Sequence, residues 1–342
     1  MEHRQDTAAP AGIRREVDQM DHADFAGALR EAFIGKTGQY RGVNLPASKG
    51  LTVSGNNAHA TITVRKGAVG ANMQSAASAI EGWALALIAW SGVERVTLDW
   101  EQPEGSGVND PHFQRFLYRV TRFAELLGPE VVQVAQPDRI AALRITHLGV
   151  RPTINVAQGG DTANTLSPTK SEAELEKTFV RADSPARHRL MSHLKLSKLD
   201  RQFPVGVFDG EPKAGSEIFT ARKSAVDLIG LDAHHALYLF ELKADGNNSV
   251  GAVSELFFYA MVMYDFMAGR IAFPRKKPSV RLSLTVEEVR NSRSIHALLF
   301  ARDFHPLISA PMLEPLNAGA RRLGWPIDFS TLRLGPFLIP ED

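Results

Sequence analysis

Two short apolar runs in the second half of the chain each carry charged residues, and this combination constrains the fold most. Residues 224–230 read Ser-Ala-Val-Asp-Leu-Ile-Gly, and residues 237–243 read Leu-Tyr-Leu-Phe-Glu-Leu-Lys. Each run has the length of a buried strand, and the six residues between them are typical of a turn. A buried charge costs free energy unless it is paired or binds a metal. Asp227, Glu241 and Lys243 on such strands therefore indicate a site.

These side chains favour the cleavage of phosphodiesters with a divalent metal. Negative charge builds on the phosphate and on the leaving oxygen, and a metal stabilises it and lowers the pKa of an attacking water. Mg²⁺ is held by one or two carboxylates together with waters and substrate phosphate. Asp227 and Glu241 on neighbouring strands could supply the carboxylates. Lys243, on the same sheet face as Glu241, could position or activate the water, or steady the developing charge.

This stretch resembles the PD-(D/E)xK nuclease superfamily, which has the restriction-endonuclease-like fold. The pattern has an acid in one strand, here Asp227, and (D/E)-x-K at the end of the next, here Glu241-Leu242-Lys243. In RecB-like and related members the following helix often carries Gln-x-x-x-Tyr. Glu255-Leu-Phe-Phe-Tyr259 occupies that place, with Glu instead of Gln. Val226 precedes Asp227 where the family name has proline.

Many members of this superfamily also have a helical glutamate upstream, and residues 171–180 fit that place. The apolar side of this predicted helix is formed by Ala173, Leu175, Phe179 and Val180. Glu176 falls near the middle of that side and Glu172 close to it, whereas Glu174 points away. Glu176 is therefore the first choice for the helical acid and Glu172 the second. The resemblance covers residues 171–268 and is closest to the catalytic domains of NucS-type and related nucleases.

The triplet Glu-x-Lys is a weak signal by itself, since about one is expected by chance in a chain of this size. A second triplet, Glu211-Pro212-Lys213, contains a proline and follows no apolar run, so it does not predict a catalytic strand. The acid-bearing strand before Glu241 is what distinguishes the first triplet.

The remaining pattern predicts an α/β chain in two domains, for which 342 residues suffice. We expect a tail and amphipathic helix over 1–35, a small α/β domain of unassigned role over 36–150, a linker over 151–170 and a nuclease-like domain over 171–342. The resemblance implies the element order αβββαβ and a mixed central sheet for the last domain. Helices are predicted at 13–35, 71–90, 110–127, 171–180, 185–199, 252–268 and 312–323. Further strands are predicted at 58–65, 93–100, 130–135, 280–286, 295–302 and 329–334.

Basic residues cluster in three places that could bind phosphates or form ordinary solvated faces. These are Arg115, Arg119 and Arg122; Arg187, Arg189, Lys195, Lys198 and Arg201; and Arg275, Lys276 and Lys277. The solvated face is the favoured interpretation for each cluster. The last two gain weight because they lie in the nuclease-like half.

Other features favour ordinary explanations. His234 and His235 lie in the turn between the signature strands, and no further zinc ligands are evident at suitable spacing. The glycines of residues 66–70 precede a predicted helix but lack the Gly-Lys-Ser/Thr ending of a phosphate loop. Trp83, Trp90 and Trp100 lie in apolar context and are expected in the core.

Bulk composition limits the classes of function. The net charge of +1 gives no argument for nucleic acid, and the absence of cysteine removes thiolate ligands and thiol nucleophiles. The longest apolar stretches, 83–90 and 256–263, are too short to span a bilayer. We expect a soluble cytoplasmic protein.

The sequence thus predicts a Mg²⁺-dependent endonuclease, with Mn²⁺ as an alternative metal. Asp227 and Glu241 bind the metal, Glu176 or Glu255 assists, and Lys243 handles the water. The resemblance favours DNA over RNA and implies a role in restriction, phage defence or repair. A homodimer would supply the two cuts that duplex cleavage needs. The alternative is a non-catalytic nucleic-acid-binding or structural module that retains the fold.

Overall fold

The computed structural model describes residues 19–39, 42–103, 109–156, 170–220, 224–244, 249–275 and 282–338. The helices are α1 (His22–Thr37), α2 (Lys66–Val69), α3 (Ile80–Ala86), α4 (Pro111–Leu127), α5 (Lys170–Val180), α6 (Pro185–Leu194), α7 (Gly251–Met267), α8 (Val286–Arg290), α9 (Ala310–Leu323) and α10 (Gly335–Leu338). The strands are β1 (Leu51–Gly55), β2 (His59–Val64), β3 (Arg95–Trp100), β4 (Val132–Val134), β5 (Pro152–Ile154), β6 (Leu196–Pro204), β7 (Val207–Asp209), β8 (Ala225–Asp232), β9 (Ala236–Lys243), β10 (Ser294–Ala301) and β11 (Ile327–Arg333). The predicted mixed α/β class is confirmed.

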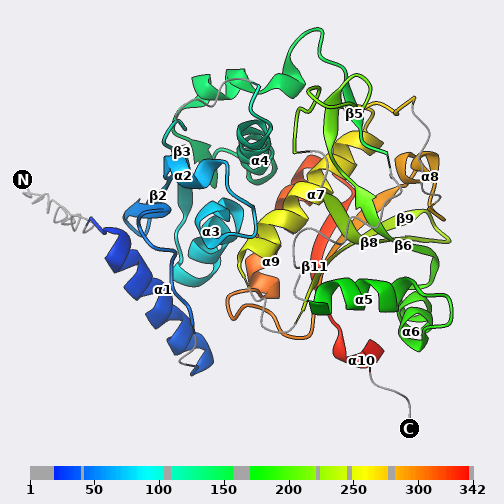
Figure 1. Ribbon diagram of the computed structural model, residues 1–342. Coiled ribbons are helices and arrows are strands. Elements are labelled where there is room, and N and C mark those ends of the chain that lie inside the picture. The colour runs from blue at the N-terminus through cyan, green and yellow to red at the C-terminus, as the bar shows by residue number, and fades with distance from the viewer. Residues whose placement is uncertain are drawn as a thin grey trace, which may run out of the picture.

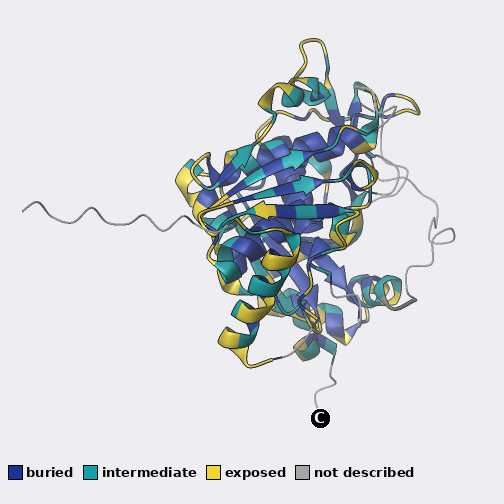
Figure 2. Ribbon diagram, turned by 90° about the vertical axis from the view of Figure 1, so that its left-hand side faces the viewer, coloured by how far each residue is buried: buried dark blue, intermediate teal, exposed yellow. Residues whose placement is uncertain are grey.

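Two mixed sheets organise the described part of the chain (Figure 1). The first has the order β1-β2-β3-β4, with β1 antiparallel to β2 and the other pairs parallel. The second has the order β11-β10-β9-β8-β6; its β6, β8 and β9 are antiparallel neighbours, and β9, β10 and β11 are parallel. Figure 2 looks onto the first sheet and shows intermediate and exposed residues along its strands.

Helix α7 connects the two halves of the structure. Fifteen of its 17 residues are buried, which is typical of a helix packed on all sides. It contacts β9 and β10 of the second sheet as well as α3 of the first half, and it runs through the middle of the molecule in Figure 1. One apolar cluster accordingly includes residues from both halves, among them Trp83, Phe123, Phe257 and Phe329.

Several elements agree with the sequence prediction because local signals and tertiary packing coincide. Helix α4 begins as expected, with the Asp110 side chain accepting a hydrogen bond from the His112 backbone at 2.9 Å and Pro111 in the first turn. Strands β2, β3, β8, β9, β10 and β11 and helices α5, α7 and α9 lie where they were predicted. Trp83 and Trp100 are buried as predicted, whereas Trp90 is only partly buried and packs against the core.

Three predicted elements are wrong. Residues 196–199, predicted as the end of a helix, belong to β6 because they pair with β8 along its free edge. Residues 282–286 are not a strand; Thr285 and Glu288 form a capping box that starts α8. The helix predicted from residue 71 starts at Ile80, and a loop with a short 3₁₀ turn precedes it.

The predicted boundaries fall partly outside the described residues. Helix α1 begins at His22, and residues 13–18 of the predicted amphipathic helix are not described. The first residues of the predicted linker form β5, which pairs with β7. Residues 157–169 of that linker are not described, and its last residue, 170, is the first of α5. Within the described residues, no helix is long and apolar enough to cross a membrane.

The basic stripe of α4 is buried, which corrects the interpretation of a solvated face. Arg119 is 1% exposed and pairs with the fully buried Glu81 of α3. Arg122 pairs with Asp265 of α7. Arg115 donates hydrogen bonds to the Thr220 hydroxyl at 2.8 Å and to a backbone carbonyl at 2.9 Å. These arginines therefore connect α4 to its neighbours and are not available to phosphates.

Candidate active site

The two signature strands separate where the charged residues begin. Pairing between β8 and β9 runs from Leu231–Leu237 to Leu228–Phe240. Extending this register by one residue would set Asp227 opposite Glu241. There the Asp227 carboxylate Oδ2 accepts a hydrogen bond from the Leu242 backbone N–H at 2.9 Å. The Asp227 side chain thus replaces a backbone carbonyl as the acceptor for this N–H. The other carboxylate oxygen, Oδ1, is left for another contact.

Glu241 and Lys243 lie side by side on β9, facing α7. Their carboxylate Oε1 and ammonium Nζ form an ion pair, and the two residues are 1% and 5% exposed. Oε2 of Glu241 is buried and has no hydrogen-bond partner. When Glu241 is protonated it can donate a hydrogen bond to the Glu255 carboxylate, whereas an ionised Glu241 leaves this buried oxygen for a cation.

Glu255 extends from α7 toward the same lysine. Its Oε2 lies 3.6 Å from Lys243 Nζ and accepts a hydrogen bond of 2.5 Å from the Gln74 side-chain amide. Its Oε1 accepts a hydrogen bond of 2.8 Å from the Tyr259 hydroxyl. The Glu-x-x-x-Tyr spacing places both side chains on one face of α7, one turn apart. The sequence prediction missed Gln74, since no pattern in the loop before α3 distinguishes it.

Both candidates for the helical acid lie at the edge of this cluster. Glu176 is 8% exposed; its Oε2 accepts a hydrogen bond from the Gln202 amide at 3.0 Å and lies 3.6 Å from an Arg201 nitrogen. Glu172, one turn earlier, accepts a hydrogen bond of 3.3 Å from the Ala244 backbone at the end of β9. The structure therefore gathers every predicted site residue, and Glu176 is the more buried of the two helical acids.

The crowding of carboxylates shifts the pKa values of the acids. Desolvation, with the charges of Glu176 and Glu255, raises the pKa of Asp227 to about 8 against the opposing effect of Lys243. Burial and the neighbouring Glu255 raise the pKa of Glu241 well above its usual range. Burial and mutual repulsion thus favour the protonated forms of both acids, whereas a bound cation would favour the ionised forms.

Glu255 and Lys243 are shifted toward their charged forms. Burial opposes ionisation of Glu255, but Lys243 and the hydrogen bonds with Glu241, Tyr259 and Gln74 lower its pKa. Burial also opposes the charge on Lys243, but Glu241, Glu255 and the other carboxylates raise its pKa well above the usual value. Lys243 is thus an ammonium group throughout the neutral range.

Asp227 and Glu241 fit a divalent cation by their donor chemistry. Carboxylate oxygens are the ligands that Mg²⁺ and Mn²⁺ prefer, and the buried Oε2 of Glu241 lacks a partner. Among the described residues no three His, Asp or Glu side chains are grouped to hold an ion together. A Mg²⁺ site that uses two carboxylates with waters and substrate phosphate does not need a third.

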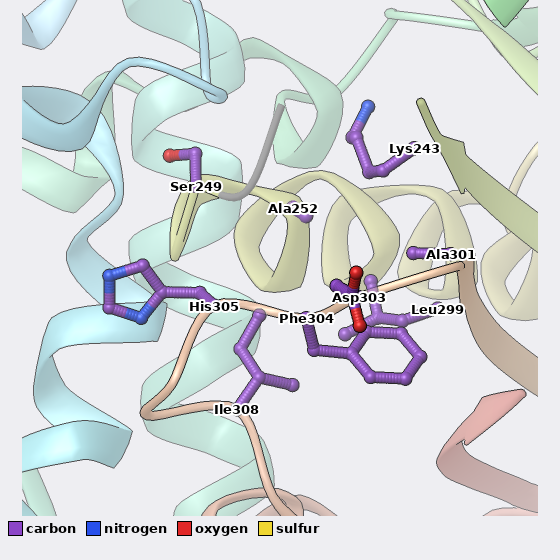
Figure 3. A pocket seen from close by; sticks show the side chains of 9 residues that line it. All are labelled: Lys243, Ser249, Ala252, Leu299, Ala301, Asp303, Phe304, His305 and Ile308. Carbon is purple, nitrogen blue, oxygen red and sulfur yellow. The ribbon is translucent and has the colours of Figure 1, made fainter. Parts of the chain in front are cut away.

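A cavity of about 10 Å³ lies beside the cluster, between Lys243, the first turn of α7 and residues 299–308 (Figure 3). Figure 3 shows Lys243 on one side of the cavity and His305 on the other. This volume is enough for about one water molecule, not for a nucleotide. Solvent reaches the cluster at Asp227, which is partly exposed.

The other sequence candidates lie apart from this cluster. His234 and His235 are exposed in the β8–β9 turn, as predicted. Glu211 and Lys213 of the second triplet are exposed in a loop.

The basic side chains of residues 187–201 mostly form hydrogen bonds and ion pairs within the protein. Arg187 donates to the carbonyls of Val180 and Leu199. Arg189 donates to the carbonyl of Phe337 at 2.8 Å. Lys198 pairs with Glu288 of α8 at 2.5 Å. Structural hydrogen bonds therefore account for most of this cluster, while Lys276 and Lys277 of the third cluster lie outside the described residues.

Comparisons with known proteins give no family assignment. No family model matches the chain, and no curated protein and no solved structure matches it.

Proposed function

We propose that the protein is a metal-dependent nuclease that hydrolyses phosphodiester bonds, with DNA as the favoured substrate. The observation that carries the proposal is the convergence of Asp227, Glu241, Lys243 and Glu255 from two strands and a helix. Elements α5, β6, β8, β9, α7 and β10 come in the αβββαβ order that the PD-(D/E)xK resemblance implies, with α6, β7 and α8 as additional elements between them, and this order supports the proposal.

Each residue has a role that its contacts support. Asp227 and Glu241 would hold Mg²⁺ or Mn²⁺ through their free carboxylate oxygens. The bound metal would stabilise negative charge on the phosphate and favour ionisation of water. Lys243, held as an ammonium between Glu241 and Glu255, donates hydrogen bonds to water or to a phosphate oxygen and offsets the charge that develops there.

In the reaction, a water oxygen forms a bond to phosphorus while the bond from phosphorus to the leaving sugar oxygen breaks. The proton lost by the water goes to solvent or substrate oxygen, because Lys243 is already protonated. The leaving oxygen takes a proton from solvent. Glu176 lies further out, and its hydrogen bond from Gln202 supports the edge of the cluster near Asp227.

The test is a substrate panel of plasmid, linear duplex and single-stranded DNA and RNA, each with Mg²⁺, Mn²⁺ or EDTA. Lys243→Ala and Asp227→Ala are expected to reduce cleavage by at least about 100-fold, as for groups that contact the reacting atoms. Lys213→Ala, in the exposed Glu-x-Lys triplet, is the matched control and should cleave like the wild type.

Cleavage that survives Lys243→Ala and Asp227→Ala would contradict the proposal. A protein that binds nucleic acid but neither cleaves it nor binds Mn²⁺ would instead favour the non-catalytic module. The proportion of nicked and linear plasmid would report whether the strands are cut singly or together, as a dimer would do.

A further inference from the structure

The loop before α3 brings a residue of the N-terminal half into the carboxylate cluster. Gln74 is separated from Glu255 by 181 positions, yet its side-chain amide donates a hydrogen bond of 2.5 Å to Glu255 Oε2. The Ser249 hydroxyl donates a hydrogen bond of 2.9 Å to the Gln74 carbonyl. The backbone and the side chain of Gln74 are therefore both held at the amino end of α7.

The approach of this loop to α7 leaves no space for a larger residue. A Cβ atom placed on Gly251 would lie 2.4 Å from the Gln74 carbonyl oxygen. In α3, which follows this loop, a Cβ on Gly82 would lie 2.7 Å from the Val250 carbonyl oxygen. Gly251 of the second half and Gly82 of the first half thus let the two backbones approach each other closely next to Gln74.

Gln74 shares a carboxylate oxygen with the lysine. Oε2 of Glu255 accepts the Gln74 amide and also lies 3.6 Å from Lys243 Nζ, whereas Lys243 forms its closer ion pair with Glu241. A neutral donor on Oε2 satisfies Glu255 and leaves the ammonium group with Glu241. Without this donor, Glu255 would compete for the Lys243 ammonium group and draw it away from Glu241.

We propose that Gln74 is a positioning residue: it fixes the carboxylate of Glu255 and thereby the placement of Lys243 beside Glu241. This inference rests on the proposed nuclease function and adds that the N-terminal half supplies part of the site. Gln74 is not expected to touch substrate, so it should affect turnover and metal binding rather than substrate affinity.

The test compares full-length Gln74→Met with full-length Gln136→Met. Gln136 is a matched control, since its amide donates to the Asp99 carboxylate at 2.6 Å elsewhere in the N-terminal half. Gln74→Met should lower kcat by about 10- to 100-fold and weaken Mn²⁺ binding in calorimetric titration, as losses of supporting hydrogen bonds at metal sites do. The KM for DNA should stay within about twofold, as for a group that does not bind substrate.

A second variant separates positioning from folding. Gln74→Asn keeps the amide but shortens the side chain by one methylene, so it should also lower kcat while its thermal midpoint stays near that of Gln136→Met. Equal kcat, KM and Mn²⁺ affinity in Gln74→Met, Gln74→Asn and the control would overturn the inference. If the wild type binds Mn²⁺ but cleaves nothing, the nuclease proposal fails, and weaker Mn²⁺ binding by the Gln74 variants would still support positioning.

Discussion

Asp227 is held in the folded protein at a cost in stability. Its pKa is raised to about 8, chiefly by desolvation and by nearby carboxylates. An acid whose pKa is higher when folded stabilises the protein at low pH, and this stabilisation is lost as pH rises from its ordinary pKa toward 8. Such a cost is typical of functional sites, where groups are placed for chemistry rather than for packing.

Asp227→Asn should therefore stabilise the metal-free protein while it abolishes cleavage. The amide keeps an acceptor for the Leu242 N–H but carries no charge. In urea unfolding with EDTA, the gain in free energy of unfolding should grow from pH 5 to about 1–3 kcal/mol at pH 8. Asp183→Asn, at a side chain that is 77% exposed, is the control. A gain that is the same at pH 5 and pH 8 would rule out this account of Asp227.

His305 should give the opposite pH dependence. Burial lowers its pKa to about 4 from 6.5, and its Nδ1 accepts a hydrogen bond from the Leu307 backbone at 3.3 Å. The unfolded chain takes up a proton as pH falls below 6.5, so stability decreases down to about pH 4, by up to about 3 kcal/mol. His305→Gln should flatten this acid limb relative to the exposed His235→Gln. Parallel acid limbs for all three proteins would contradict the prediction.

At the scale of elements, the sequence is sufficient to predict a helix or strand wherever one local pattern decides its structure. The strands that carry Asp227 and Glu241 and the apolar helix after them are such cases. The helix predicted over 185–199 is wrong from residue 196 onward, because pairing along the edge of β8 overrides the local pattern there. The sequence predicts helix for the loop before α3, and it does not predict the position of Gln74. Its shape depends on contact with α7, which lies far away in the sequence.

Two glycine substitutions test that contact between elements. Gly251→Ala, at the start of α7, should destabilise the protein by about 1–3 kcal/mol, because its Cβ would lie 2.4 Å from the Gln74 carbonyl oxygen. Gly27→Ala, inside α1 with nothing within 4 Å of the new Cβ, should stabilise it by about 0.5–1 kcal/mol. Thermal or urea unfolding measures both. A neutral Gly251→Ala would mean that the loop does not pack closely on α7.

At the scale of the whole molecule, a buried polar network joins the halves that the sequence separates into domains. Asp265 of α7 accepts a hydrogen bond of 2.7 Å from the Tyr118 hydroxyl and pairs with Arg122, both on α4. Arg270 also pairs with Asp265, at 2.7 Å. A fragment limited to the second half would lose these partners and expose the apolar face of α7. The composition of α4 predicted a solvated stripe because its acidic partners lie on other elements.

This network predicts that both halves unfold together. Asp265→Ala leaves the buried Arg122 with only the half-exposed Glu125 as an acidic partner and removes the acceptor of the Tyr118 hydroxyl, so it should cost about 3–5 kcal/mol. Tryptophan fluorescence reports mainly the first half, which holds Trp83, Trp90 and Trp100, whereas far-UV circular dichroism reports both halves. The two signals should follow a single urea transition that the substitution moves as a unit. Asp303→Ala, in an exposed pair with Arg333 at 3.6 Å, should shift it little. Two separate transitions, with only one moved by Asp265→Ala, would show that the halves are independent folding units.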